Sequence, residues 1–263
     1  MARGRTERLL IARAGQARPD QVIVEEPLEI RLDGRPVTTT MRTPGHDFEL
    51  AVGFLHAEGM LGAARIEHIR YCATGSAVDT AFNVVEVGTG GVAAPAVPRM
   101  GTTTSACGLC GSAAIDELAE RMRPLDDPVA VHAAAMTAVP LRVRAMQSLF
   151  EATGAVHAAA PFDAATGDVW LVREDIGRHN AVDKVVGRLL LDGRLPATGA
   201  GLFVSGRASF EMVQKAWAAG FGLVAAVSGP SSLAVHTARR ANVALVGFLR
   251  ETSFNVYAPT PLA

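Results

Sequence analysis

The sequence predicts an α/β protein with a mostly parallel sheet covered by helices. From about residue 129 onward, strand-like and helix-like segments alternate, which is typical of parallel strands joined by helical crossovers. Before that point the segments are shorter and rich in strand-forming residues. We therefore expect a β-rich portion in residues 21–128 and an α/β portion in residues 129–263, which together can form one compact unit.

Turn-forming residues and the spacing of apolar residues predict the elements of the β-rich portion. Residues 1–20 are polar and predict a loose leader. Short alternating apolar pieces on both sides of Asp33 and Gly34 predict a hairpin within residues 22–41. The further expected elements are a helix from about residue 47 to 59, two strands within residues 65–88, and a Gly/Ala/Pro-rich connector at residues 88–98.

The α/β portion is divided by the same signals. The expected helices cover residues 141–153, 182–191, 210–219 and 232–240. The expected strands cover residues 155–160, 169–173, 201–204, 223–227 and 243–248.

Composition excludes several classes of protein. The formal net charge of −1 argues against a broad surface for nucleic acid or anionic membranes. The longest apolar run, residues 216–227, is too short to span a bilayer, and the apolar piece at residues 9–12 is too short for a signal peptide. Three cysteines make no disulfide framework, so we expect a reducing cytoplasmic compartment.

Two of the three cysteines, Cys107 and Cys110, lie in a Gly/Ser/Thr-rich segment at residues 101–111. Two thiols at this spacing can bind a metal, cycle as a disulfide or relay sulfur, and the pattern alone leaves all three open. A predicted helix begins at Ser112, and its dipole would lower the pKa of a thiol placed just before it. The segment therefore predicts a reactive sulfur.

Two strand-to-helix turns resemble each other. One contains Ser205, Gly206 and Arg207, and the other contains Ser228 and Gly229. In an open α/β sheet such turns lie at the carboxyl ends of strands, where ligands bind. Glycine allows close approach, and hydroxyls, helix amides and an arginine bind phosphate oxygens. Either turn taken alone could equally be an ordinary turn with an N-capping serine. The repetition of the pattern favours a phosphate-bearing ligand.

A dense polar cluster begins a predicted helix near residue 178. Its candidate binding residues are Arg178, His179, Asn180, Asp183 and Lys184. We expect Asp183 to orient the ring of His179 four residues away. Arg178 and Lys184 would hold anionic oxygens, and Asn180 would read a ligand edge. The alternative is a solvated helix start with local ion pairs. Glu211 and Lys215, also four apart, are expected to form a surface pair.

A zinc site has weak support. His56 and Glu58, with the Cys107 and Cys110 pair, are similar to the zinc deaminase signature. However, Ala106 stands where that signature has proline, and Gly59 places His56 and Glu58 at a helix end. We therefore expect no metal bound by the protein.

Taken together, these motifs resemble the formate dehydrogenase accessory sulfurtransferases, the FdhD family, from about residue 20 to the end. The resemblance rests on Cys107-Gly-Leu-Cys110, Glu174-Asp-Ile-Gly-Arg-His-Asn-Ala-Val-Asp-Lys184, Val204-Ser-Gly-Arg207, Val227-Ser-Gly-Pro230, Thr43-Pro-Gly-His46, Gly247-Phe-Leu-Arg250 and Phe254-Asn-Val-Tyr257. Of these, the run from Arg178 to Lys184 is the most specific.

This resemblance implies a cytoplasmic homodimer with a cytidine-deaminase-like, three-layer α/β/α fold and an N-terminal β-rich portion. It implies relay of persulfide sulfur from a cysteine desulfurase to the molybdenum or tungsten bis(molybdopterin guanine dinucleotide) cofactor, bound as substrate, before insertion into formate dehydrogenase. Cys107 would carry the persulfide, with Cys110 as its partner. The implied cofactor segment comprises Phe248, Leu249, Arg250, Glu251, Thr252, Ser253 and Phe254. Two alternatives stay open: a non-catalytic chaperone that holds the cofactor, and a zinc hydrolase of the deaminase type.

Overall fold

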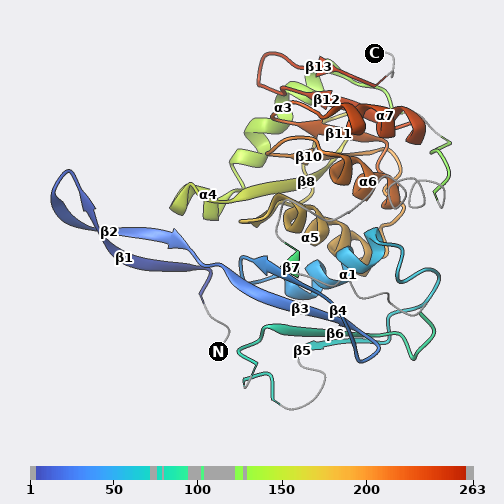
Figure 1. Ribbon diagram of the computed structural model, residues 1–263. Helices are drawn as coiled ribbons and strands as arrows, with labels where there is room; N and C mark the ends of the chain where they lie inside the picture. Colours follow the sequence, from blue (N-terminus) through green and yellow to red (C-terminus); the bar gives the residue numbers. More distant parts are fainter. Residues whose placement is uncertain are drawn as a thin grey trace.

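A six-stranded sheet formed by the second half of the chain has helices on both faces (Figure 1). The computed structural model describes residues 4–71, 76–78, 80–93, 102–103, 122–126 and 129–258. In spatial order the strands are β13 (Asn255–Val256), β12 (Ala244–Gly247), β11 (Leu223–Ala226), β10 (Ala200–Val204), β8 (His157–Asp163) and β9 (Arg173–Asp175). The predicted α/β class is confirmed.

Strand direction determines which side chains meet at each edge of this sheet. Strands β10, β11 and β12 run parallel, whereas β8 and β13 run antiparallel to their neighbours β10 and β12. Strand β9 is antiparallel to β8 and so points the same way as β10. The carboxyl ends of β9, β10, β11 and β12 therefore lie along one edge, together with the first residues of β8 and β13.

Small strand residues allow helices to pack closely on both faces. The helices are α3 (Ala133–Arg144), α4 (Ser148–Thr153), α5 (Arg178–Leu191), α6 (Phe210–Ala218) and α7 (Ser232–Ala241). On one face, buried residues of α5, α6 and α7 form a core with alternate strand residues such as Ala159 and Leu202. On the other face, α3 covers the intervening positions, including Ala158 and Phe203. This alternation follows from the two-residue period of a strand.

A second sheet is formed by the first half of the chain. Its order is β5 (His68–Tyr71), β6 (Val84–Gly88), β3 (Glu26–Leu32), β4 (Arg35–Arg42) and β7 (Thr102–Thr103). The predicted hairpin is confirmed, since β3 and β4 pair antiparallel around Asp33 and Gly34, which both have positive φ. Helix α1 (Asp47–Ala57) covers this sheet and ends next to Glu58, close to the predicted end.

Two glycines let α1 and α5 touch and so join the two portions. A methyl group on Gly53 would overlap the carbonyl oxygen of Asp183, and one on Gly187 would overlap the carbonyl oxygen of Glu49. Both residues lie within helices, where glycine is otherwise unfavourable. The close crossing of these helices therefore requires glycine at both positions.

The predicted loose leader is a β-hairpin in the part that the structure describes. Strands β1 (Thr6–Arg13) and β2 (Gln16–Ile23) pair along their whole length, turning at Ala14 and Gly15, which have positive φ. Figure 1 shows the hairpin projecting away from both larger sheets. Because it is exposed on both sides, its sequence lacks the apolar alternation of a half-buried strand. Among the helices described, none is long and apolar enough to cross a membrane.

Candidate functional site

The two Ser-Gly turns lie together at the carboxyl edge of the six-stranded sheet. Ser228 N donates to Gly206 O at 3.2 Å, and Ser231 N donates to Ala208 O at 3.0 Å. The side chain of Ser231 caps α7 by accepting from Ala234 N at 3.1 Å. The predicted placement of both turns at one edge is therefore confirmed, as is the capping role of one serine.

A cationic cluster surrounds the first turn. Arg178, the first residue of α5, lies close to Gly206, since a methyl group there would be 3.4 Å from its Cδ and 3.5 Å from Cε1 of His157. Within the described part of the chain, Arg178 Nε is buried and has no hydrogen-bond partner. Burial and the neighbouring Arg207 both lower the pKa of Arg178, against the opposing effect of Glu211. Like charges and an unpaired buried donor fit an anionic ligand.

A neutral histidine borders this cluster. Burial, followed by the charges of Arg178 and His179, lowers the pKa of His157 below its usual value. Its Nδ1 lies 3.4 Å from Ser205 Oγ, which accepts a hydrogen bond from Ala158 N at 2.9 Å. His157 therefore offers the site an uncharged imidazole at neutral pH.

The partner predicted for His179 is wrong. Its Nε2 lies 3.0 Å from Glu211 Oε2 on α6, whereas Asp183 Oδ1 accepts from Lys215 Nζ at 2.6 Å. Lys215 is only 3% exposed, so Glu211 and Lys215 are not a surface pair. Each carboxylate takes its partner from the neighbouring helix because α5 and α6 pack together, which four-residue spacing within one helix cannot reveal.

Lys184 and Asn180 form hydrogen bonds that connect the two portions. Lys184 Nζ is fully buried and donates to Asp175 Oδ2 at 2.7 Å and to Thr43 O at 2.9 Å. Asn180 Nδ2 donates to Met41 O at 2.7 Å and to Asp175 Oδ1 at 3.0 Å, and its Oδ1 accepts from a threonine of β4. The donors of both side chains are therefore engaged by protein groups, and their anion-holding and edge-reading roles stay predictions.

The predicted cofactor segment follows β12 at the same edge. Phe248 has φ of 52° and is 46% exposed, and its ring approaches Gly229, where a methyl group would be 2.9 Å from Cζ. Arg250 Nη1 donates to Val227 O at 2.5 Å. Leu249 is buried in the core, and Phe254 is partly buried against that core. Glu251, Thr252 and Ser253 are exposed.

A cavity of about 540 Å³ opens beside the cationic cluster. His157 and Ser205 belong to both features. The other lining residues come mainly from α3, α4 and the strand ends: Pro140, Arg144, Gln147, Phe150, Gly154, Ala155, Val156, Ile176, Phe203, Val227 and Glu251. Its size and mixed lining are those of a small-molecule site. No local motif predicted it, because α3 and α4 reach it only through tertiary packing.

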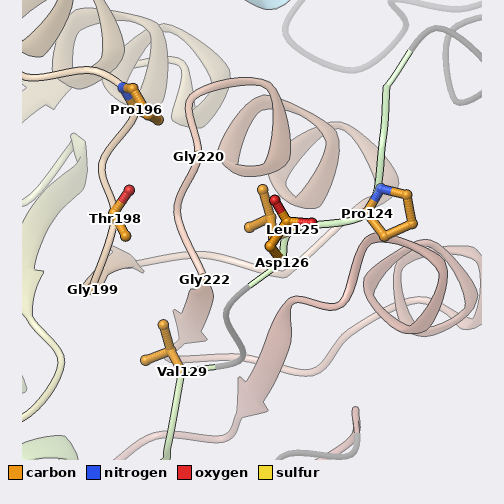
Figure 2. Close-up of a pocket in the computed structure, with 9 residues that line it drawn as sticks. All are labelled: Pro124, Leu125, Asp126, Val129, Pro196, Thr198, Gly199, Gly220 and Gly222. Atoms are coloured by element: carbon orange, nitrogen blue, oxygen red, sulfur yellow. The ribbon is translucent and has the colours of Figure 1, made fainter.

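A smaller cavity of about 200 Å³ lies at the opposite edge of the sheet, before β10 and β11 (Figure 2). Its wall is formed largely by backbone and small residues, including Gly199, Gly220, Gly222 and Pro196. Among the described residues that line it, Asp126 alone is charged. It offers far fewer polar groups for a ligand than the carboxyl edge does.

The zinc hypothesis finds no support in the described residues. His56 lies at the end of α1, and its Nε2 contacts Ala218 O at 3.1 Å. Over those same residues, no group of three or more His, Cys, Asp or Glu side chains is arranged to hold a metal ion. Cys107 and Cys110 lie outside the described residues.

The described residues that precede the two cysteines, Thr102 and Thr103, pair with β4. Thr103, in β7, pairs with Thr40 of β4, and Thr40 Oγ1 lies 3.3 Å from Asn180 Oδ1 at the start of α5. Cys107 follows Thr103 by four residues. An extended chain of that length spans at most about 14 Å.

The fold and the site define a mixed α/β protein with a candidate anion site at the carboxyl edge of its sheet. The chain belongs to the FdhD/NarQ family, whose model matches residues 23–261. It is 51% identical to the sulfur carrier protein FdhD of Streptomyces avermitilis over 96% of this chain and 94% of that one. Identity to the protein of the same name from Mycobacterium tuberculosis is 48%, over 91% of this chain and 90% of that one.

A solved structure supports the same relationship. The crystal structure described as that of a formate dehydrogenase accessory protein from Desulfotalea psychrophila matches with a TM-score of 0.73 and 26% identity. The match covers 97% of this chain and 96% of that one. The matched length therefore includes both larger sheets and the carboxyl edge of the six-stranded sheet.

Proposed function

We propose that this protein is a sulfur carrier that relays persulfide sulfur from a cysteine desulfurase to the molybdenum or tungsten bis(molybdopterin guanine dinucleotide) cofactor. Formate dehydrogenase would receive the sulfurated cofactor. The cofactor is a substrate here, and the protein binds no metal of its own. Relatives about half identical to this chain are named sulfur carriers, and the similar solved structure is described as a formate dehydrogenase accessory protein.

The observation that carries this proposal is the cationic cluster at the carboxyl edge of the six-stranded sheet, where Arg178 Nε has no hydrogen-bond partner among the residues that the structure describes. A guanine dinucleotide bears phosphates, and phosphate oxygens would complete the hydrogen bonding of Arg178 and offset its repulsion from Arg207. Gly206 lets the ligand approach the backbone, and the amides at the start of α6 favour negative charge. Cys107 follows Thr103 by four residues, and Thr103 pairs with Thr40, which contacts Asn180 at the start of α5.

The chemistry follows from thiolate exchange. The Cys107 thiolate attacks the outer sulfur of the desulfurase persulfide, so that the S–S bond breaks and the desulfurase cysteine leaves as a thiolate. Cys107 then holds the persulfide. Attack by the Cys110 thiolate on the inner sulfur releases hydrosulfide to the substrate and leaves a Cys107–Cys110 disulfide, which a cellular dithiol reduces. In this scheme the second cysteine supplies the electron pair for sulfur release.

The resemblance supports three further proposals. The protein acts as a homodimer, its α/β/α layers follow the cytidine-deaminase-like arrangement, and it works in the cytoplasm, where thiols stay reduced. Sedimentation of the purified protein tests the first of these directly.

The test of sulfur carriage uses the full chain, a cysteine desulfurase and free cysteine. After loading, mass mapping should find added sulfur on the peptide containing Cys107, and a Cys107→Ala variant should lose it. A Cys110→Ala variant should load normally and fail to release sulfur. Equal loading of the wild type and Cys107→Ala would refute the carrier role.

A chaperone that only holds the cofactor would use the same cationic edge. It predicts that cells carrying Cys107→Ala keep their formate dehydrogenase activity. The sulfur carrier predicts that the activity is lost, so one cellular assay separates the two functions.

A further inference from the structure

The β1–β2 hairpin is a two-stranded arm that projects from the molecule and is largely exposed (Figure 1). Among the described residues β1 pairs with β2 alone, so the outer edge of β1 carries unpaired backbone groups. Leu10, near the middle of β1, is 78% exposed. A two-stranded ribbon is only marginally stable in water without a further strand or a covering helix. We therefore expect this edge to pair with another strand.

The two edges of the arm differ in their capacity for pairing. Strand β2 contains Pro19, which has no N–H to donate, and proline at an edge blocks the approach of a further strand. Strand β2 also lies against α4 of its own chain. The eight residues of β1 include neither proline nor glycine. The outer edge of β1 is therefore the one that can accept a strand.

The sequence of β1 is complementary to itself when it is read in the opposite direction. If two copies pair antiparallel about a twofold axis at Leu10, Glu7 of each copy lies opposite Arg13 of the other. In the same register Leu9 lies opposite Ile11, and the two copies of Leu10 face each other. Opposite charges or apolar side chains placed directly across two strands stabilise a sheet.

Neighbouring registers lose this complementarity. The axis can move only from one residue to the next, because directly opposed residues must lie on the same face of the sheet. An axis at Leu9 puts Arg13 opposite Arg5, which sets two like charges against each other. An axis at Ile11 puts Arg13 opposite Leu9. The charges therefore favour the register centred on Leu10.

A cavity at the base of the arm fits the tip of a second arm. It has a volume of about 520 Å³, and its lining includes the carboxylates of Glu7 and Glu25. The tip is basic, since Arg13 and Arg18 flank the turn. In the register centred on the middle of β1, the turn of the second copy lies opposite Thr6, which also lines the cavity. The charges of tip and base are therefore complementary.

We propose that the β1 strands of two copies of this chain pair edge to edge and join the two arms into one four-stranded antiparallel sheet. Leu10 lies on the twofold axis, and Glu7 of each copy faces Arg13 of the other. The interface rests on the homodimer of the proposed function and names the surface on which the two copies meet.

Sedimentation velocity of the full-length protein over a range of concentrations measures the affinity of the dimer. Glu7→Arg should weaken the dimer at least about tenfold, because attraction becomes repulsion at two symmetric contacts. Arg13→Glu should weaken it similarly. The double variant Glu7→Arg/Arg13→Glu should recover the wild-type affinity, since the exchanged charges again face each other. Asp20→Arg is the matched control, because it makes the charge change of Glu7→Arg on β2, away from the outer edge of β1.

A wild type that stays monomeric at every concentration would overturn the proposal. So would a double variant whose dimer is no tighter than those of the single variants. A dimer that none of these charge changes affects would overturn the pairing of the arms and leave the homodimer of the proposed function standing. Sulfur loading of Cys107 is measured separately on the same proteins, so failure of the arm pairing is distinguishable from failure of the carrier function.

Discussion

At the scale of single residues, Arg178 differs from the other charged groups of its helix. Lys184 and Asp183 have buried partners, and Arg188 pairs with Asp192 at 2.8 Å. Arg178 Nε, by contrast, has none among the described residues. A buried donor without a partner costs free energy that a ligand oxygen can recover. We therefore expect Arg178 to contribute directly to anion binding.

Replacement of Arg178 tests this role. We expect Arg178→Met to weaken pyrophosphate binding by at least about tenfold, because a charge-assisted hydrogen bond contributes about 1.5–3 kcal/mol. Arg188→Met, on the same helix and far from the edge, should bind as the wild type does. Calorimetry with pyrophosphate measures both, and unchanged affinity in Arg178→Met would argue against an anion site here.

A second residue-scale prediction concerns Glu49 and acid stability. Burial alone would raise the pKa of Glu49, but hydrogen bonds from Arg173, with His46 contributing, lower it to about 2. A carboxylate whose folded pKa is lowered stabilises the fold above its unfolded value of 4.5, and this stability is lost as pH falls toward 2. Glu49→Gln should therefore flatten the fall of unfolding free energy between those pH values, as measured by urea unfolding. An unchanged slope would show that Glu49 is not the group titrating.

At the scale of elements, the sequence predicts most strands and helices of the second half of the chain. The exceptions are elements whose ends are set by contacts with other elements. The helix expected over residues 141–153 is two helices, α3 and α4, since α3 already begins at Ala133 and contains Pro140. The strand expected over residues 169–173 is shorter and later, at β9, because Val169 makes only an isolated bridge to Phe162. The spacing of apolar residues alone does not show which residues of a strand pair with a neighbouring strand.

The crossing of α1 and α5 gives the element-scale prediction. Helix propensity alone would make Gly187→Ala stabilising by about 1 kcal/mol. The overlap with the Glu49 carbonyl predicts the opposite, a loss of about 1–3 kcal/mol, because backbone cannot move aside as a side chain does. Urea unfolding of Gly187→Ala, with Arg188→Ala as the neighbouring control, measures the sign. A gain in stability would contradict the close crossing.

At the scale of the whole molecule, the sequence predicts the parts of the candidate site that lie at one edge of the sheet. It does not predict the parts where side chains from different helices meet. The Ser-Gly turns and the start of α5 follow from strand ends and capping residues. The roles of Lys184 and Asp183 depend on Asp175 and Lys215, which belong to other elements. The cavity lined by Arg144 and Glu251 needs residues more than a hundred positions apart. Such groups are brought together only by tertiary packing.

On the proposed function, the whole molecule connects two separable activities, sulfur carriage and ligand binding, and this yields the final prediction. Arg178→Met should load sulfur on Cys107 as the wild type does, since in the proposed scheme the transfer from the desulfurase requires only the Cys107 thiolate. Cys107→Ala should bind pyrophosphate normally and take up no sulfur. In cells lacking their own copy, neither variant should restore formate dehydrogenase activity, and both should accumulate as folded protein. Activity restored by either variant would mean that carriage and binding are not both required.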